Sequence, residues 1–236
     1  MLLTVIIITL LAGLAMALGA LIAHIENIQQ QWLEEEVRHG IVAFGGGALL
    51  SAVALVLVPE GIAEYSPLSA CAWFILGGFA FMLLDIFLKK VDTPASQLAA
   101  MLSDFIPESI ALGAAFATGN SSAYLLAGLM ALQNLPEGFS AYRELNATST
   151  YNPSKVILLF ASMALLGPLF GVSGYLWLSH NPEAVAAIML FASGGIVYSI
   201  FQDIAPQVKL ENHWAPPLGA LLGFSLGMFG LMITKA

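Results

Sequence analysis

Two short stretches of the chain repeat one arrangement of acids, amides and proline. The first runs from Asp104 to Glu108 and the second from Gln133 to Glu137, and in each a proline directly precedes the glutamate. Residues four apart share one face of a helix, about one turn from each other, so each stretch presents two oxygen-bearing side chains together. Carboxylate and amide oxygens in such a set are ligands for a divalent cation.

A polar turn at 119–122 lies between the two stretches, with apolar sequence on both sides. A short turn predicts that the helices it joins run antiparallel, side by side. Counting from the turn, Glu108 and Gln133 lie at similar depth, and so do Asp104 and Glu137. Each proline removes a backbone donor and is predicted to kink its helix beside the acid. The four side chains are therefore expected to converge between two helices.

The composition places these polar residues in a membrane. Of the 236 residues, 59% are apolar and only 9% are charged, and the mean hydropathy is +0.87. A soluble domain of this size carries about a quarter charged residues. We therefore expect an all-α, polytopic membrane protein with one transmembrane domain over residues 1–236, embedded in a lipid bilayer. The net charge of −8 gives no reason to expect a nucleic-acid partner.

Buried acids in such a protein need an explanation. Each carboxylate at membrane depth costs roughly 2.5–3.5 kcal/mol to insert. Three that face one another repel unless a proton or a cation neutralises them, and a cation site resolves that conflict. The alternative is that each glutamate accompanies a structural proline and extends toward water.

Eight apolar segments have the ~20 residues that a bilayer requires. The first is interpreted as a transmembrane helix rather than a cleaved signal, because it lacks a basic start and is long enough to span. The lone Cys71 excludes an intramolecular disulfide. The predicted spans are about 2–24, 40–62, 68–88, 96–118, 122–144, 154–179, 183–207 and 215–235.

The basic residues predict the orientation of the spans. With the N-terminus outside, the inward-facing connections hold six of the seven, and only Lys235 falls on the outer side. The excess of Lys and Arg in cytoplasmic connections then predicts that both termini lie outside. The six inward residues are Arg38, Lys89, Lys90, Arg143, Lys155 and Lys209.

Three further polar positions lie near predicted span ends. Glu60 follows Pro59 at the outer end of the second span, where it is either an entrance group or simply exposed to water. Asp85 and Lys89 are four apart and predict an ion pair at the membrane interface. Asp203, in a polar patch near the inner end of the seventh span, is a candidate exit group.

The paired motifs resemble those of the ZIP (Zrt-/Irt-like) family of metal transporters, and the resemblance covers essentially the whole chain. The stretch Gly45-Gly46-Gly47-Ala48-Leu49-Leu50-Ser51 leading to Pro59-Glu60, and Leu84-Asp85 closing the third span, add to it. In that family the fourth and fifth spans read His-Asn-x-Pro-Glu-Gly and (His/Gln)-(Asn/Asp)-x-Pro-Glu-Gly, and they hold a two-metal centre midway across the membrane.

The resemblance implies a role for individual residues. Glu108, Gln133 and Glu137 match three ligands of the first metal position, and Asp104 stands where the family has histidine. Asn134 matches a ligand of the second position. The chain departs from the family at this second position, because Phe105 replaces an asparagine and Gly167 stands where many members have a glutamate. The common His-Glu-x-x-Pro-Glu of the seventh span is replaced by a pattern that runs from Gln202 to Gln207.

What the resemblance implies for function is uptake of a divalent metal toward the cytoplasm, with the metal as substrate and no cofactor. Zinc is the family's usual substrate, whereas a ligand set made only of oxygens also suits manganese or iron. The resemblance further implies a homodimer in a cell membrane, expected to be a prokaryotic inner membrane. It also implies an elevator-like movement of spans one, four, five and six against the others.

The sequence bears on three other classes of function. An enzyme is not expected, because no two histidines have metalloprotease spacing and Ser109 and Ser140 have no histidine nearby in sequence. A non-transporting ZIP relative, which acts as a metal sensor or membrane scaffold, is the alternative that Phe105 and Gly167 motivate. A transporter for another small cation or solute is a third reading.

Overall fold

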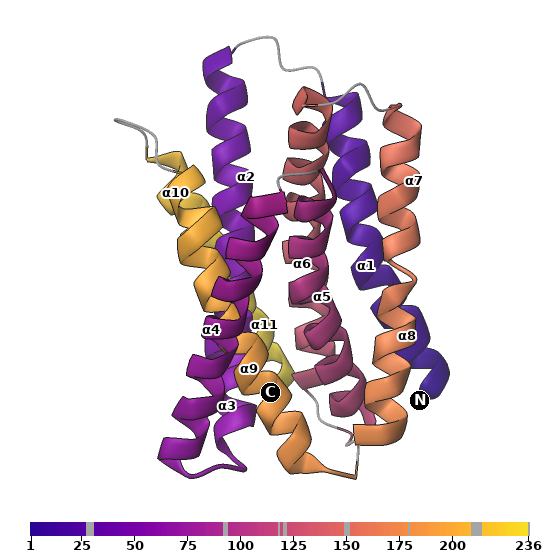
Figure 1. Cartoon of the computed structure of the whole chain (residues 1–236), viewed down its shortest axis with the longest axis vertical. Helices are drawn as coiled ribbons and strands as arrows, with labels where there is room; N and C mark the ends of the chain where they lie inside the picture. The colour runs from indigo at the N-terminus through magenta and orange to yellow at the C-terminus, as the bar shows by residue number, and fades with distance from the viewer. Residues whose placement is uncertain are drawn as a thin grey trace.

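The computed structural model describes residues 1–26, 31–91, 94–117, 119, 122–148, 152–178, 180–208 and 214–235. This part of the chain contains helices and no strand. The long helices run roughly along one axis and form a single bundle (Figure 1). An all-α protein was predicted, and this is confirmed.

Several helices continue directly into a π-helical turn. The bounds are α1 Leu2–Ile25; α2 Gln31–Ala52, η1 Val53–Leu57 and α3 Val58–Ile62; α4 Pro67–Val91; α5 Pro94–Ala117; α6 Ser122–Thr148; α7 Pro153–Met163; α8 Leu166–Ser173 and η2 Gly174–Leu178; α9 Pro182–Ser199, η3 Ile200–Ile204 and α10 Ala205–Gln207; α11 Ala215–Lys235.

Six helical segments of the described chain are long and apolar enough to cross a membrane, which indicates a multi-pass membrane protein. The helices α5 and α6, predicted as the fourth and fifth spans, are not among them, and they carry the polar motifs. The second span was expected to begin at residue 40, whereas its helix begins at Gln31. The six segments are Leu2–Ile25, Glu36–Ile62, Pro67–Lys90, Pro153–Leu178, Pro182–Gln207 and Ala215–Thr234.

Proline accounts for several boundaries and irregularities. It occupies the first position of α4, α5, α7 and α9, where a helix needs no backbone donor. Pro168 interrupts the predicted sixth span, because it has no N–H to donate to the carbonyl of Ala164. That carbonyl accepts instead from the Gly167 backbone N–H at 3.1 Å, and the helix breaks between Met163 and Leu166.

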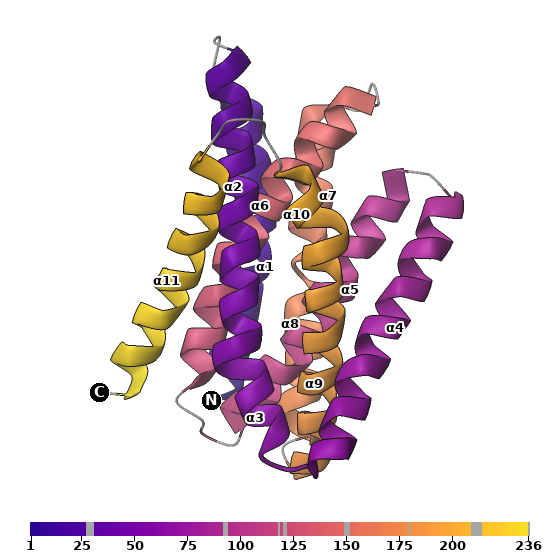
Figure 2. The same cartoon turned by 90° about the vertical axis from the view of Figure 1, so that its left-hand side faces the viewer.

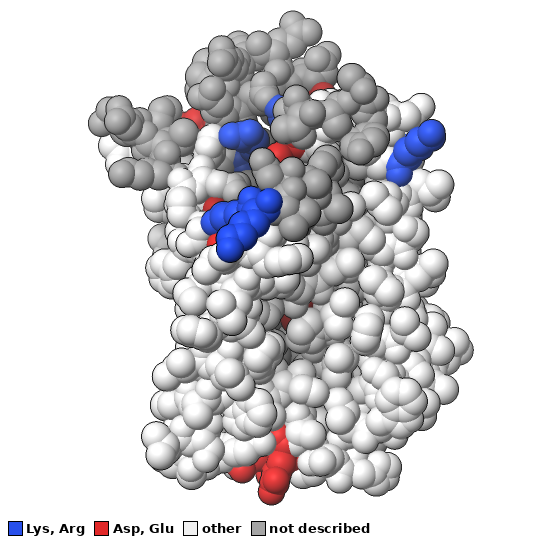
Figure 3. All heavy atoms as spheres, in the orientation of Figure 1, with Lys and Arg blue, Asp and Glu red and all other residues white. Residues whose placement is uncertain are grey.

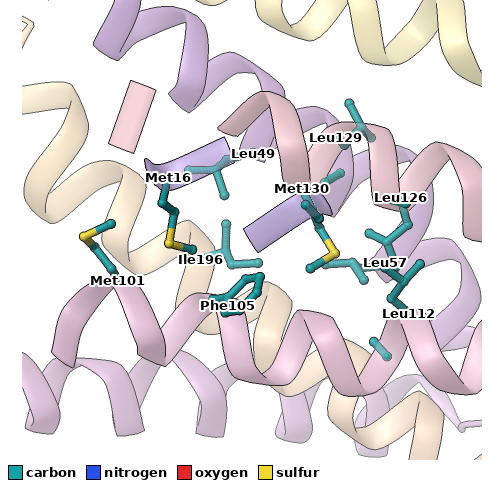
Figure 4. Packing of buried hydrophobic residues seen from close by; sticks show 14 of the residues in the cluster. Met16, Leu49, Leu57, Met101, Phe105, Leu112, Leu126, Leu129, Met130 and Ile196 are labelled. Atoms are coloured by element: carbon teal, nitrogen blue, oxygen red, sulfur yellow. The ribbon is translucent and has the colours of Figure 1, made fainter. Parts of the chain in front are cut away.

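The centre of the bundle is closely packed. Phe105 of α5 and Ile196 of α9 lie near each other there, with Met16 of α1 and Met130 of α6 in the same layer (Figure 4). Met101, Met130 and Met163 all belong to this buried apolar cluster. The prediction that these methionines pack, rather than serve as soft metal ligands, agrees with their positions.

Both ends of the described chain lie at the same end of the bundle (Figures 1 and 2). In the face that Figure 3 shows, the visible Lys and Arg side chains gather toward the opposite end, and acids mark the end with the termini. This distribution agrees with the predicted grouping of the basic residues. Lys209 lies outside the described residues.

Glycines bring certain pairs of helices into backbone contact. A side chain at Gly138 of α6 would collide with the Met16 carbonyl oxygen of α1, and one at Gly113 of α5 with the Gly171 carbonyl oxygen of α8. Likewise, Gly47 of α2 lies against Ala220 of α11, and Gly77 of α4 against Phe191 of α9. Small residues at these positions permit the close approach.

These contacts divide the helices into two groups. We call α1, α5, α6, α7 and α8 the site group, and α2, α3, α4, α9 and α11 the flanking group. Across the boundary, the nearest atoms to a Cβ at two glycines of the described chain belong to side chains. A Cβ at Gly45 of α2 would lie 2.6 Å from Cγ of Pro136, and one at Gly230 of α11 would lie 2.6 Å from Cδ1 of Leu125.

Candidate functional site

The predicted ligand residues lie in the middle of the site group, on α5 and α6. Glu108, Gln133 and Asn134 are fully buried, and Asp104 is 9% exposed. Glu137 is partly buried, one helical turn from Gln133. Pro107 and Pro136 lie inside their helices, as the sequence predicted. These polar side chains therefore sit within an otherwise apolar bundle.

One contact joins the two motifs directly. The Gln133 side-chain amide donates a hydrogen bond from Nε2 to Oε2 of Glu108 at 2.6 Å. This confirms that the two residues lie at the same depth on neighbouring helices, as counting from the turn predicted. Gly119 in that turn has φ +71°, a left-handed conformation that glycine adopts without strain.

The remaining acids lie around this pair. Glu137 interacts electrostatically, as a like charge, with both Asp104 and Glu108. That Asp104 and Glu137 share a depth stays a prediction. The three carboxylates thus belong to one electrostatically linked set.

Asn134 points toward a different helix. Its Nδ2 donates to the backbone carbonyl oxygen of Ala12 in α1 at 2.8 Å. Its Oδ1 is buried and finds no hydrogen-bond partner among the described residues. Asn134 therefore ties α6 to α1 and leaves one oxygen available.

The site gathers buried oxygens that nothing in the described chain satisfies. These atoms are Asp104 Oδ1, Glu108 Oε1, Ser109 Oγ, Gln133 Oε1, Asn134 Oδ1, Glu137 Oε2 and Ser140 Oγ. A buried polar group without a partner costs about 1–3 kcal/mol, so these oxygens on α5 and α6 call for ligands or water. Carboxylate, amide and hydroxyl oxygens form a set that suits a hard divalent cation.

Ser109 and Ser140 were missed as site residues by the sequence analysis. The other fully buried hydroxyls satisfy themselves within their own helices: Thr9 donates to the Val5 carbonyl, Ser51 to Ala48 and Ser193 to Met189, each at 2.7 Å. Ser140 could have been found, because it lies three residues after Glu137 on the same helix face. No pattern in the sequence singles out Ser109.

The carboxylates do not meet at one point in this conformation. Within the described part of the chain, no three His, Cys, Asp or Glu side chains lie close enough together to hold a metal ion. Glu108 is held by Gln133. Coordination by all three carboxylates requires side-chain rotation or movement of α5 against α6.

The Phe105 ring lies buried between α1 and α8. Phe105 is 1% exposed. A Cβ added at Gly13 would lie 2.8 Å from its Cζ, and one added at Gly167 would lie 3.0 Å from it. The two departures from the family pattern, Phe105 and Gly167, therefore face each other, and the aromatic ring takes the space between them.

Polar contacts also lie at the ends of the bundle. Toward the chain termini, Ser122 at the start of α6 donates from Oγ to Oε1 of the partly buried Glu60, at 2.7 Å. Glu60 thus links α3 to the site group instead of simply facing water.

Toward the basic end, Lys89 pairs with Asp85 at 2.9 Å, which confirms the predicted ion pair. The Tyr198 hydroxyl of α9 donates to the same carboxylate at 3.1 Å. Asp203 interacts as a like charge with Asp85, and also with Asp104 in the site. Acidic groups therefore continue from the central site toward the basic end.

No protein-family model and no curated protein sequence matches this chain.

Proposed function

We propose that the chain is a membrane transporter of divalent metal ions, a divergent relative of the ZIP family that moves metal toward the cytoplasm. The observation that carries this proposal is the set of buried, unpartnered oxygens on α5 and α6 within an apolar bundle. Lipid and apolar side chains cannot satisfy these oxygens, whereas a passing cation neutralises the acids and accepts their lone pairs.

In this proposal the metal enters between Glu108 and Gln133. Binding replaces the hydrogen bond between these side chains, and Oε1 of each is already without a partner in the described chain. Asp104 and Glu137 then turn toward the ion and complete its shell. Protons compete with the metal for the same carboxylate oxygens.

The ligand set bears on which metal is carried. It contains three carboxylates and one amide, without imidazole or thiolate among the predicted ligands. Oxygen ligands suit Mn²⁺ and Fe²⁺, and Zn²⁺ also accepts carboxylates. A transporter site must release its ion, so a set that binds zinc loosely suits transport. Zinc, manganese and iron are therefore the substrates to test.

The two helix groups support a transport movement. The site group corresponds to the spans that the resemblance assigns to the moving bundle, and its helices are joined to one another by backbone contacts at glycines. At Gly45 and Gly230 its nearest contacts with the flanking group are side chains, which a sliding movement rearranges. In this proposal the site group carries the metal, the basic end faces the cytoplasm, and a homodimer forms through the flanking group.

The test is metal flux into proteoliposomes made with the purified protein. Glu108→Ala and Glu137→Ala are each expected to lower uptake of Mn²⁺ or Zn²⁺ by at least about tenfold, since each removes a ligand. Glu64→Ala, which removes an exposed acid outside the site, is the matched control and keeps parental uptake. Parental uptake in both site variants would end the proposal.

A non-transporting ZIP relative is the second candidate, and one observation favours it. Phe105 and Gly167 replace two residues that the resemblance assigns to the second metal position, and the buried Phe105 ring lies against Gly167. Such a sensor or scaffold binds metal at Glu108 and Gln133 without moving it. Equilibrium binding without flux in the same vesicles identifies this function, whereas binding with flux identifies a transporter.

A further inference from the structure

A groove of about 580 Å³ lies on the boundary between the two helix groups. Helices α1 and α6 of the site group form one side, and α2 and α11 of the flanking group form the other. The groove opens on the outer surface of the bundle, where Leu218 and Leu222 of α11 are 54% and 59% exposed. In a multi-pass membrane protein, that surface faces hydrocarbon.

The residues that line this groove among those described are apolar, with Phe44, Leu132 and Pro136 at its walls. An apolar cavity stays dry, and an empty one forfeits the dispersion contacts of its lining. The volume falls within the range of ligand pockets, about 300–1,000 Å³. A flexible hydrocarbon chain from the surrounding bilayer meets these conditions.

A second copy of the chain fits the groove poorly. A helix with its side chains is about 10–12 Å across. A single acyl chain is narrower than a helix and can enter between α2 and α6.

Two arginine side chains lie near one end of the groove. Arg143 lies one helical turn beyond the lining residue Phe139, with its Cζ 5.8 Å from the centre of that ring. Arg143 forms an ion pair with Glu26 of α1, and Arg38 of α2, next to the lining residue Val37, adds a further positive charge. Basic residues between membrane helices at the cytoplasmic side bind anionic head groups.

We propose that this groove is a binding site for one acyl chain of an anionic membrane phospholipid, whose phosphate lies near Arg38 and Arg143. Trp214, 80% exposed, directly precedes the lining residue Ala215. Tryptophan is enriched at the membrane interface, where a head group lies. The bound chain contacts both helix groups at once. The site stands independently of metal transport, because no predicted metal ligand lines it.

The chain offers a matched pair of variants. Gly40 lines the groove, and a Cβ added there has no atom within 4 Å, so Gly40→Leu places a side chain in the groove without displacing its neighbours. Gly128 on α6 is equally open at its Cβ but does not line the groove. Gly128→Leu is therefore the control for the effect of the substitution itself.

The experiment uses the full chain in vesicles that contain a phosphatidylglycerol with a photoactivatable acyl chain. After illumination, peptides that cover residues 37–44 and 132–139 of the parent are expected to carry the lipid. Gly40→Leu loses this labelling and Gly128→Leu keeps it. Equal labelling of both variants, or label confined to other peptides, overturns the proposal.

A second arm addresses the head group. Native mass spectrometry compares lipid retained from vesicles of phosphatidylglycerol with lipid retained from phosphatidylethanolamine. The parent is expected to keep phosphatidylglycerol preferentially. Arg38→Gln loses that preference, and Lys155→Gln, which removes an exposed basic residue away from the groove, keeps it. No preference in the parent overturns the anionic assignment. If Gly40→Leu leaves lipid labelling unchanged and alters only the cross-linking of one copy of the chain to another, the groove binds a second copy instead.

Discussion

Buried hydroxyl groups in this bundle behave in two ways. Thr9, Ser51 and Ser193 donate to carbonyls of their own helices, which is how a hydroxyl is usually satisfied in apolar surroundings. Ser109 and Ser140 do not find a partner in the described chain. Both adjoin the proposed metal ligands, so their oxygens are free to hold the ion or a water bound to it.

Ser140→Ala therefore tests the extent of the site. One lost hydrogen bond or ligand contact is worth about 0.5–1.5 kcal/mol, so we expect apparent metal affinity to fall about two- to tenfold. Isothermal titration of the purified protein measures it. Ser193→Ala, which removes a hydroxyl already satisfied in α9, leaves affinity unchanged. An unchanged affinity in Ser140→Ala restricts the site to the carboxylates and amides.

Under the proposed function, the Phe105 ring takes the space of the second metal position. Phe105→Asn is expected to open this space and to add an amide near the unpartnered oxygens of Asn134 and Glu108. We predict that the ratio of bound metal to protein rises from one to two, as measured by elemental analysis after equilibrium dialysis. Phe105→Leu, which supplies no ligand, keeps a ratio of one. A ratio of one in both variants refutes the role assigned to the ring.

At the scale of helices, the close pairing of α1 with α6 depends on Gly138. A Cβ there would collide with the Met16 carbonyl, and relief requires the two helices to separate. Gly138→Ala is expected to destabilise the protein by about 1–3 kcal/mol, as overpacking does. Gly128→Ala on the same helix meets no atom within 4 Å and gains helix propensity. Thermal unfolding in detergent should therefore show a lowered Tm for Gly138→Ala and not for Gly128→Ala.

The positions of the helices could be predicted from the sequence because each helix end depends on residues close to it in the chain. The first predicted span, 2–24, corresponds to the helix Leu2–Ile25. Three further helices begin at prolines 67, 153 and 182, where the apolar runs begin. Asn152 and Asn181 cap α7 and α9 by accepting from Ser154 and Ala184 backbone N–H groups. The break after Met163 was missed, since Pro168 sits within an uninterrupted apolar run that resembles one span.

The site was predictable only where its geometry is set by counting along two helices. The turn near Gly119 fixed the register of Glu108 against Gln133, and the hydrogen bond confirms it. The contact of Phe105 with Gly167 depends on how α5 packs on α8, which no local pattern encodes. The groove likewise depends on the packing of four helices, so it could not be predicted from the sequence around lining residues such as Phe44 and Leu218.

At the scale of the molecule, the gathering of Lys and Arg at one end predicts how the bundle sits in a cell membrane. In a Cys71→Ser background, Glu64→Cys at the end with the termini is expected to react with a membrane-impermeant thiol reagent added to intact cells. Lys155→Cys, at the basic end, should react only after permeabilisation, because Lys and Arg concentrate on the cytoplasmic side. The reverse pattern of labelling would invert the proposed direction of uptake.

Because both ends of the described chain emerge on the same side of the bundle (Figures 1 and 2), two copies can be fused in tandem. A short hydrophilic linker from the last residue of one copy to the first residue of the next never has to traverse the lipid. Such a fusion keeps both halves in the same orientation. A substitution can then be placed in one half only, so that each half's contribution to metal uptake is measured within one polypeptide.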